Sequence, residues 1–372
     1  MAVGFPAKTD FATGDVLTAT NMNDITGTLN LLQSTLYPAG RNKFINGDFN
    51  INQRGFTTQT NGTGTFGFDR FKMNGVDGTS TFTAQTFTPG TAPVAGYEAT
   101  NFLRIVTTGQ TLTTAESNVF QAIEDVRTFA GQTILISFWA KADSGTPKIS
   151  AELRQNFGSG GSTTVSTPVG ASTISTSWAR YSLSVTVPSI SGKTIGASSS
   201  LNVVFFVSAG TSLNTRASSI GIQSNTFEIW GMQVEAASTG STASPFQTAS
   251  GSIQGELALC QRYYFRNTVA SATGVFNTVY NSAISTTHSY MIIQPPVPLR
   301  TGTTAVEYST LRLNDGVASQ PITALTLGLS PSSSSAILLD ATIGTPDLTT
   351  YRPYFLQANA SATAYIGFSA EL

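Results

Sequence analysis

The sequence predicts a mainly β protein with a short N-terminal helix, an antiparallel β-sandwich and a second β-rich domain. Short runs that alternate apolar and polar residues recur from position 41 onward. The stretches between them are rich in Gly, Ser, Thr and Pro, which favour turns. Because a chain of 372 residues is longer than a typical single domain, we expect two domains, at 41–250 and 251–372, after an N-terminal segment of residues 1–40.

Residues 1–40 contain the helical pattern. Its apolar side chains repeat in steps of three and four at Met22, Ile25, Leu29, Leu32 and Leu36. Such steps keep one narrow seam facing a partner helix, as in a coiled coil, and here they span about two heptads. Gly27 within the seam costs about 1 kcal/mol relative to Ala, so the seam can align chains but cannot hold them together alone. We predict oligomerisation through it, and a lone amphipathic helix on its own domain is the alternative.

Strand patterns fill residues 41–249. Within residues 133–141, Ile134, Ile136 and Phe138 fall on one face of a strand, which we expect to point into a core. The same alternation occurs at Tyr181, Leu183, Val185 and Val187. Further strands are predicted at 101–108, 201–210 and 226–235. Strands without helices between them predict an antiparallel sandwich rather than alternating strands and helices.

The chain changes character near position 250. Residues 247–255 are small and polar and predict a linker. The following run, GELALCQRYYFRN, is expected to open the second β-rich unit, and its single cysteine, Cys260, is expected in the core. Strands are predicted there at 289–296, 309–315 and 363–372.

Composition argues against several classes of function. Charged residues make up 10% of the chain and the net charge is -1, so we expect neither nucleic-acid binding nor attraction to an anionic membrane. The sequence contains no apolar run long enough to predict membrane insertion, and residues 1–14 lack the pattern of a signal peptide. One cysteine allows neither an intrachain disulfide nor a site with several thiolates.

We expect no enzymatic activity. His288 is the only histidine, and the sequence has no nucleophile-elbow motif. Glycan cleavage is the enzymatic alternative, because it needs only two carboxylates about 5 to 9.5 Å apart. Candidate acids for such a pair are Glu98, Glu116, Glu124, Asp125 and Glu152.

Several motifs carry a family resemblance. NKFINGDFNINQRG at 42–55, followed by FGFDRF at 66–71, resembles the opening of a jelly-roll domain found in phage tail-fibre and minor structural proteins. Residues 121–145, 177–187 and 227–247 are similar to its later strands, in the same order. Residues 256–266 and 293–304 resemble the β-rich tip of such fibres. Residues 4–32 resemble the proximal end by which they dock.

The resemblance implies a carbohydrate-binding-like jelly roll followed by a second, sandwich-like domain. It also implies a structural fibre component of a bacteriophage virion, a tail fibre made in the host cytoplasm. We expect a homotrimer that docks to other virion proteins through residues 1–40 and presents its β domains to host surface polysaccharide. Alternatives are an architectural head fibre or tail adaptor that binds only virion proteins, and a glycan depolymerase.

Aromatic side chains and two acids supply the candidate site residues, the acids because carbohydrate-binding jelly rolls often carry a structural ion. Aromatic side chains that could meet a ligand or a neighbouring subunit are Trp139, Trp178, Tyr263 and Tyr264, with ordinary packing as the alternative. No cofactor is expected apart from a structural calcium ion, for which Asp48 and Glu235 on the first and last strands are candidates.

Structural roles are predicted for the resembling motifs themselves. Asn46, Gly47 and Asp48 predict a turn between apolar residues. Asp69 and Arg70 are expected to form an ion pair that closes a sheet edge.

Overall fold

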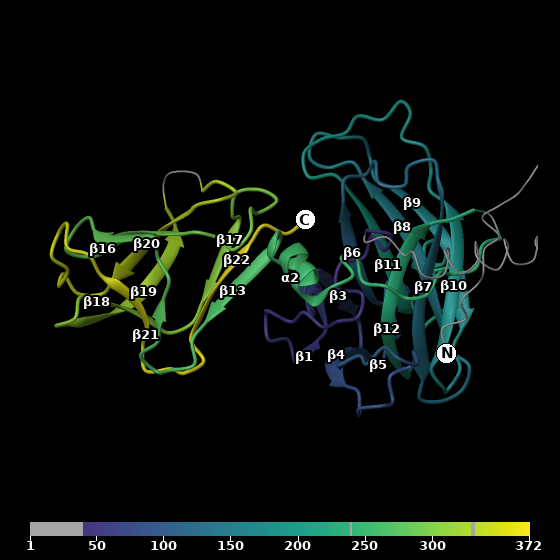
Figure 1. The fold of residues 1–372 in the computed structure, drawn as a ribbon. Helices are drawn as coiled ribbons and strands as arrows, with labels where there is room; N and C mark the ends of the chain where they lie inside the picture. The colour runs from purple at the N-terminus through teal and green to yellow at the C-terminus, as the bar shows by residue number, and fades with distance from the viewer. Residues whose placement is uncertain (1–39, 239, 329–331) are drawn as a thin grey trace, which may run out of the picture.

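The computed structural model describes residues 40–238, 240–328 and 332–372. These residues form two β-rich domains with the short helix α2 (Ile253–Gln261) between them (Figure 1). The predicted N-terminal helix and its seam lie outside the described residues, so self-association through Met22, Ile25, Leu29, Leu32 and Leu36 stays a prediction. No helix within the described ranges has both the length and the apolar character needed to span a membrane.

The first domain contains two six-stranded antiparallel sheets. Sheet A has the order β1 (Thr58–Thr60), β4 (Thr79–Thr86), β5 (Asn101–Thr108), β12 (Asn225–Ala236), β7 (Thr133–Ala142) and β10 (Ala179–Thr186). Sheet B has the order β2 (Gly62–Phe66), β3 (Phe71–Val76), β6 (Glu116–Glu124), β11 (Ser200–Ala209), β8 (Lys148–Asn156) and β9 (Val165–Thr173). From β5 to β8 and again from β10 to β12, the chain changes sheet at every step, as in a jelly roll. The predicted antiparallel sandwich is confirmed.

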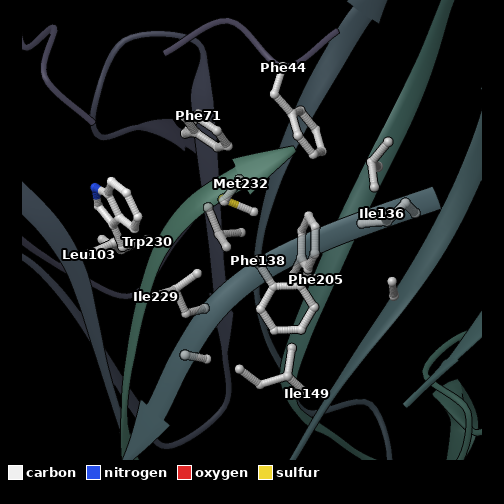
Figure 2. Close-up of a cluster of buried hydrophobic side chains, with 14 of the residues drawn as sticks. Phe44, Phe71, Leu103, Ile136, Phe138, Ile149, Phe205, Ile229, Trp230 and Met232 are labelled. Carbon is white, nitrogen blue, oxygen red and sulfur yellow. The ribbon is translucent and has the colours of Figure 1, made fainter. Parts of the chain in front are cut away.

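The core of this domain lies between the two sheets. Ile134, Ile136 and Phe138 on β7 are fully buried, as their alternation predicts. Phe44, from the FINGDF motif, joins them: its ring centroid lies 6.0 Å from that of Phe205, which lies 5.3 Å from that of Phe138 (Figure 2). Burying such a side chain stabilises the fold by about 1.5–3 kcal/mol, so the motif anchors the start of the domain.

The predicted turn at 46–48 is confirmed. Asn46 has a φ of 63°, and its side chain both donates to the Ile51 carbonyl and accepts from the Ile51 N–H, each at 2.8 Å. A Cβ atom at Gly47 would lie 2.2 Å from the Met232 carbonyl oxygen. Glycine is therefore required where this turn packs against β12.

The second domain has one core between two antiparallel sheets. The smaller sheet has the order β13 (Tyr264–Thr268), β22 (Tyr365–Ser369) and β17 (Ala305–Tyr308). The larger has the order β14 (Val275–Phe276), β21 (Phe355–Ala358), β18 (Leu311–Asn314), β19 (Ser319–Leu327), β20 (Ile337–Ile343), β16 (His288–Ile293) and β15 (Tyr280–Ala283). An antiparallel bridge between Ser282 and Pro353 brings β15 back beside the segment that leads into β21, so the larger sheet closes on itself.

The linker predicted at 247–255 is wrong in its last part. Helix α2 starts at Ile253, because the Ser252 side chain caps it by accepting the Gly255 N–H at 3.1 Å. Glu256 and Cys260, four residues apart, form its buried side, whereas the sequence suggested that this run opens a β unit. Cys260 is fully buried, as predicted.

Candidate functional site

The domain joint is built from the FINGDF and FDRF motifs, α2 and the last residues of the chain. Arg70 is 3% exposed and pairs with Glu371 from the second domain. Its guanidinium also lies 3.5 Å from the centre of the Tyr263 ring and donates to the Ala122 carbonyl at 2.7 Å. Figure 1 shows the C-terminus between the two domains, beside α2. The strand-edge ion pair predicted between Asp69 and Arg70 is therefore wrong.

Asp69 has a different partner. The backbone N–H of Gln53 donates to its carboxylate at 2.9 Å, and the Gln53 side-chain amide donates both to Asp69 and to the Tyr264 carbonyl. Burial raises the pKa of Asp69 above its ordinary value, while the hydrogen bonds from Gln53 and the charge of Arg54 lower it. Asp69 thus positions a loop of the first domain against the second domain.

The neighbouring contacts bury both predicted tyrosines. The Arg54 guanidinium lies 3.5 Å from the centre of the Tyr264 ring, and Arg266 donates to the Arg54 carbonyl at 2.6 Å. Tyr264 is fully buried and Tyr263 is 3% exposed. The Tyr263 hydroxyl donates to Glu124 at 2.8 Å. Both rings therefore belong to the joint rather than to an exposed surface of the second domain.

Helix α2 is joined to the first domain through its own acid. Glu256 is 1% exposed, and its carboxylate accepts the N–H of Asn46 at 2.7 Å and the N–H of Ser250 at 2.6 Å. Burial raises the pKa of Glu256, and these two hydrogen bonds partly oppose that shift. Together with the arginine contacts, this carboxylate fixes the two domains relative to each other.

A second feature, the sheet-A hollow, lies on the face of sheet A that points away from the core. It has a volume of about 360 Å³. Three neighbouring strands build it, because Arg104 on β5 stands opposite Glu228 on β12, and Glu228 stands opposite Lys141 on β7. Its lining consists of Arg104, Val106, Lys141, Ala142, Asp143, Thr176, Thr226 and Glu228.

The polar groups of the hollow are held in place by ion pairs. Arg104 Nε donates to Glu228 at 2.9 Å, and Lys141 Nζ lies 2.9 Å from the other carboxylate oxygen. The Glu228 side chain is 7% exposed, while those of Arg104 and Lys141 are 37% and 34% exposed. A preformed acceptor flanked by two accessible donors suits a ligand with many hydroxyl groups.

An aromatic ring stands beside these groups. Trp178 is half-buried, and its ring centroid lies 5.6 Å from those of Phe87 and Phe102. Lys141 Nζ lies 5.7 Å from the Trp178 ring, so this indole borders the hollow. The structure thus places Trp178 next to polar groups that could bind a ligand, while Tyr263 lines a separate cavity of about 600 Å³ at the domain joint.

Trp139 is positioned differently. It points away from the inter-sheet core, as its alternation with Phe138 predicts, but other side chains cover it. Its ring lies 5.5 Å from Trp230 and 6.1 Å from Phe246, and the Arg180 guanidinium lies 4.4 Å from the ring centre. The Trp139 side chain therefore packs against other side chains of the domain, which was the alternative to ligand contact.

Asp48 and Glu235 take part in separate networks. Asp48 accepts the Tyr97 hydroxyl at 2.8 Å, and burial raises the pKa of Asp48. Glu235 accepts the Ser244 hydroxyl at 2.7 Å and pairs with Arg41 at 2.7 Å. Among the described residues, no group of three or more His, Cys, Asp and Glu side chains could hold a metal ion. The calcium site stays a prediction.

Of the five acids considered for glycan cleavage, Glu124, Asp125 and Glu152 are held in ion pairs, whereas Glu98 accepts the Gly90 N–H at 3.1 Å. Burial raises the pKa of Glu116, and the nearby charge of Glu152 raises it further. Glu152 is fully buried and pairs with Arg154 at 3.0 Å and with Arg216 at 2.8 Å. Glu124 pairs with Arg262 at 3.1 Å. His288 Nδ1 lies 3.0 Å from an Asp340 oxygen.

The charged residues of the hollow were missed by sequence reasoning. Arg104, Lys141 and Glu228 each occupy the outward position of a correctly predicted strand. In a chain with few charges, a charged residue inside an apolar strand was the available signal. Their meeting, however, depends on the strand order of sheet A.

The strand order defines the class of molecule: a two-domain β protein whose first domain has jelly-roll connectivity. The domain joint and the sheet-A hollow are its two candidate functional features. No protein-family model matches the chain. No curated protein matches it either.

Solved structures do match about half of the chain. One is described as "CBM4 structure and function": it is 16% identical, covers 52% of this chain and 98% of its own, and has a TM-score of 0.28. A putative sugar binding protein from Bacteroides thetaiotaomicron is 12% identical, with coverages of 53% and 100% and a TM-score of 0.34. The CBM22-1 xylan-binding domain of Paenibacillus barcinonensis Xyn10C is 12% identical, with coverages of 54% and 98% and a TM-score of 0.28. At this similarity the matches carry no conclusion about ligand, and the fold assignment depends on the strand order itself.

Proposed function

We propose that this protein is a structural fibre component of a bacteriophage virion, a tail fibre, which attaches to host surface polysaccharide through its first domain. The observation that carries attachment is the sheet-A hollow, where an indole borders a buried carboxylate and two accessible cations. The resemblance of residues 42–71 to phage fibre domains supports the virion assignment.

The chemistry of the hollow suits a sugar. A pyranose ring has apolar C–H faces that can pack on Trp178, and hydroxyl groups that both donate and accept. Glu228 accepts from such hydroxyls, while Arg104 and Lys141 donate to them. Because these side chains already hold one another in place, a ligand orders few of them on binding.

The domain joint supports the fibre role. Buried ion pairs and hydrogen bonds fix the second domain against the first, which suits a part that must transmit force without bending. Each hollow is open and small, so we expect weak binding per chain. Linking three chains in a homotrimer docked through residues 1–40 raises avidity without tightening any single site.

Binding of the full chain to host polysaccharides tests the proposal. We expect Trp178→Ala to weaken binding at least tenfold, a loss of about 1.4 kcal/mol. Trp139→Ala is the matched control, because it removes another half-buried indole of sheet A that does not border the hollow. We expect the control to keep wild-type affinity once circular dichroism shows that both variants are folded. Equal losses in both variants, or no binding by the wild type, would reject attachment through the hollow.

An architectural head fibre or tail adaptor is the second candidate, and the joint alone favours it. In that case the full chain binds virion proteins but no host polysaccharide. A depolymerase is less favoured, because the fully buried Glu152 is already paired with two arginines. Release of reducing ends from the polysaccharide would revive it.

A further inference from the structure

The charges that line the sheet-A hollow balance one another. Arg104 and Lys141 are its two cations, and Asp143 and Glu228 are its two acids, so their formal charges sum to zero. The side chains that complete the lining are uncharged and belong to Val106, Ala142, Thr176 and Thr226. A ligand in the hollow thus meets many polar groups but no excess of positive charge.

Both cations are already paired with Glu228. Arg104 donates to one of its carboxylate oxygens through Nε at 2.9 Å and Nη2 at 2.5 Å, and Lys141 Nζ lies 2.9 Å from the other oxygen. A ligand anion must compete with Glu228 for these donors. Ligand hydroxyls need only the N–H groups that Arg104 and Lys141 do not direct at Glu228.

Asp143 adds a second acid to the hollow. It follows the last residue of β7, its N–H donates to the Thr226 carbonyl at 3.0 Å, and it is exposed. A carboxylate on the ligand would therefore lie near two protein carboxylates, those of Asp143 and Glu228, and their repulsion offsets the attraction of the two cations. A neutral ring meets no such repulsion.

We propose that the hollow selects neutral sugars over acidic ones, and that Glu228 sets this selection. The selection rests on the proposed attachment to polysaccharide and names its ligand class, chains of neutral sugars without uronic acid or phosphate groups. Trp178 can pack on the C–H face of either kind of ring, so the indole contributes affinity without distinguishing them. Glu228 distinguishes them, because it neutralises both cations.

Matched polysaccharides test the selection. Polygalacturonate, hyaluronan and gellan are each compared with a carboxyl-reduced form, in which every carboxylate has become a hydroxymethyl group while rings and linkages stay the same. Binding to the full chain is measured at low ionic strength, where charges are least screened. In each pair that binds, we expect the reduced form to bind about fivefold more tightly or better.

Glu228→Gln should reverse this preference. The variant keeps the shape of the side chain but leaves Arg104 and Lys141 facing Asp143 alone, so a ligand carboxylate gains partners. We expect the acidic form of each pair to become the tighter ligand, and high salt to remove that gain. Glu98→Gln is the matched control, because Glu98 is an exposed acid of the same domain outside the hollow, and its preference should equal that of the wild type.

Asp143→Asn keeps the test decisive if Glu228→Gln does not fold. It makes the same change of charge at an exposed position, and it should shift the preference in the same direction. Circular dichroism establishes which variants are folded.

The possible results separate this selection from attachment itself. Equal or tighter binding of the acidic forms by the wild type would overturn the selection and leave attachment through the hollow standing. The same holds if the folded charge variants keep the preference of Glu98→Gln. No binding of any polysaccharide by the wild type would reject attachment, and the selection with it.

Discussion

Replacing Glu371 with alanine should destabilise the protein more than the loss of an exposed surface ion pair does. The side chains of Arg70 and Glu371 are 2% and 5% exposed. Removing one partner of a buried pair typically costs about 3–5 kcal/mol, because the remaining charge stays buried without its counter-charge. Arg54, whose Nη1 lies 3.5 Å from the same carboxylate, loses a partner too. We therefore expect the free energy of unfolding to fall by about 3 kcal/mol or more.

Urea unfolding of the full chain, followed by circular dichroism, measures this loss. Arg127→Ala is the matched control: it removes the partner of Asp125 in a pair whose Arg127 and Asp125 side chains are 61% and 44% exposed. Such exposed pairs contribute about 0–1 kcal/mol. Because the joint couples the domains, we also expect Glu371→Ala to separate one unfolding transition into two. Losses in the two variants that agree within about 0.5 kcal/mol would refute the role of the joint.

Two further predictions concern the first domain. Burial raises the pKa of Asp48, so the folded state binds more protons there than the unfolded state, and this contribution to stability is lost as pH rises through the raised pKa. We expect the free energy of unfolding to fall less steeply toward neutral pH in Asp48→Asn than in the wild type, as measured by unfolding at a series of pH values. Identical pH dependences in the two proteins would contradict a raised pKa for Asp48. Gly47→Ala should cost about 1–3 kcal/mol, because the new Cβ meets the Met232 carbonyl at 2.2 Å. In thermal unfolding Gly344→Ala, whose nearest contact is an ordinary 3.4 Å, should lose clearly less, and equal losses would exclude the close approach.

Much of the fold could be predicted because strand patterns are local. The strand predicted at 101–108 has the bounds of β5, and those predicted at 133–141 and 226–235 lie within β7 and β12. Helix α2 was missed because its signals, a Ser cap and two buried residues four apart, are few and lie in a stretch that also suits a linker. Residues 1–39 are outside the described ranges, so their predicted role was not tested.

The candidate site was less predictable than the fold. Trp178 was among the aromatic residues predicted to meet a ligand. The charged side chains beside it, however, come from three strands that are not consecutive in the chain. Tyr263 and Tyr264 were expected to face a ligand or a subunit. An aromatic residue looks the same in the sequence whether it is covered by solvent, a partner or another domain.

The sequence by itself determined which residues face the core, because burial on a strand follows an alternation between near neighbours. It could not determine the partner of Arg70. The counter-charge lies 301 positions away, and the charge of the adjacent Asp69 suggested a nearer one. Only the tertiary structure decided that the resembling motifs join two domains, and that Arg104, Lys141 and Glu228 meet on one face of sheet A. Both outcomes depend on how sheets close and domains dock, which local patterns do not encode.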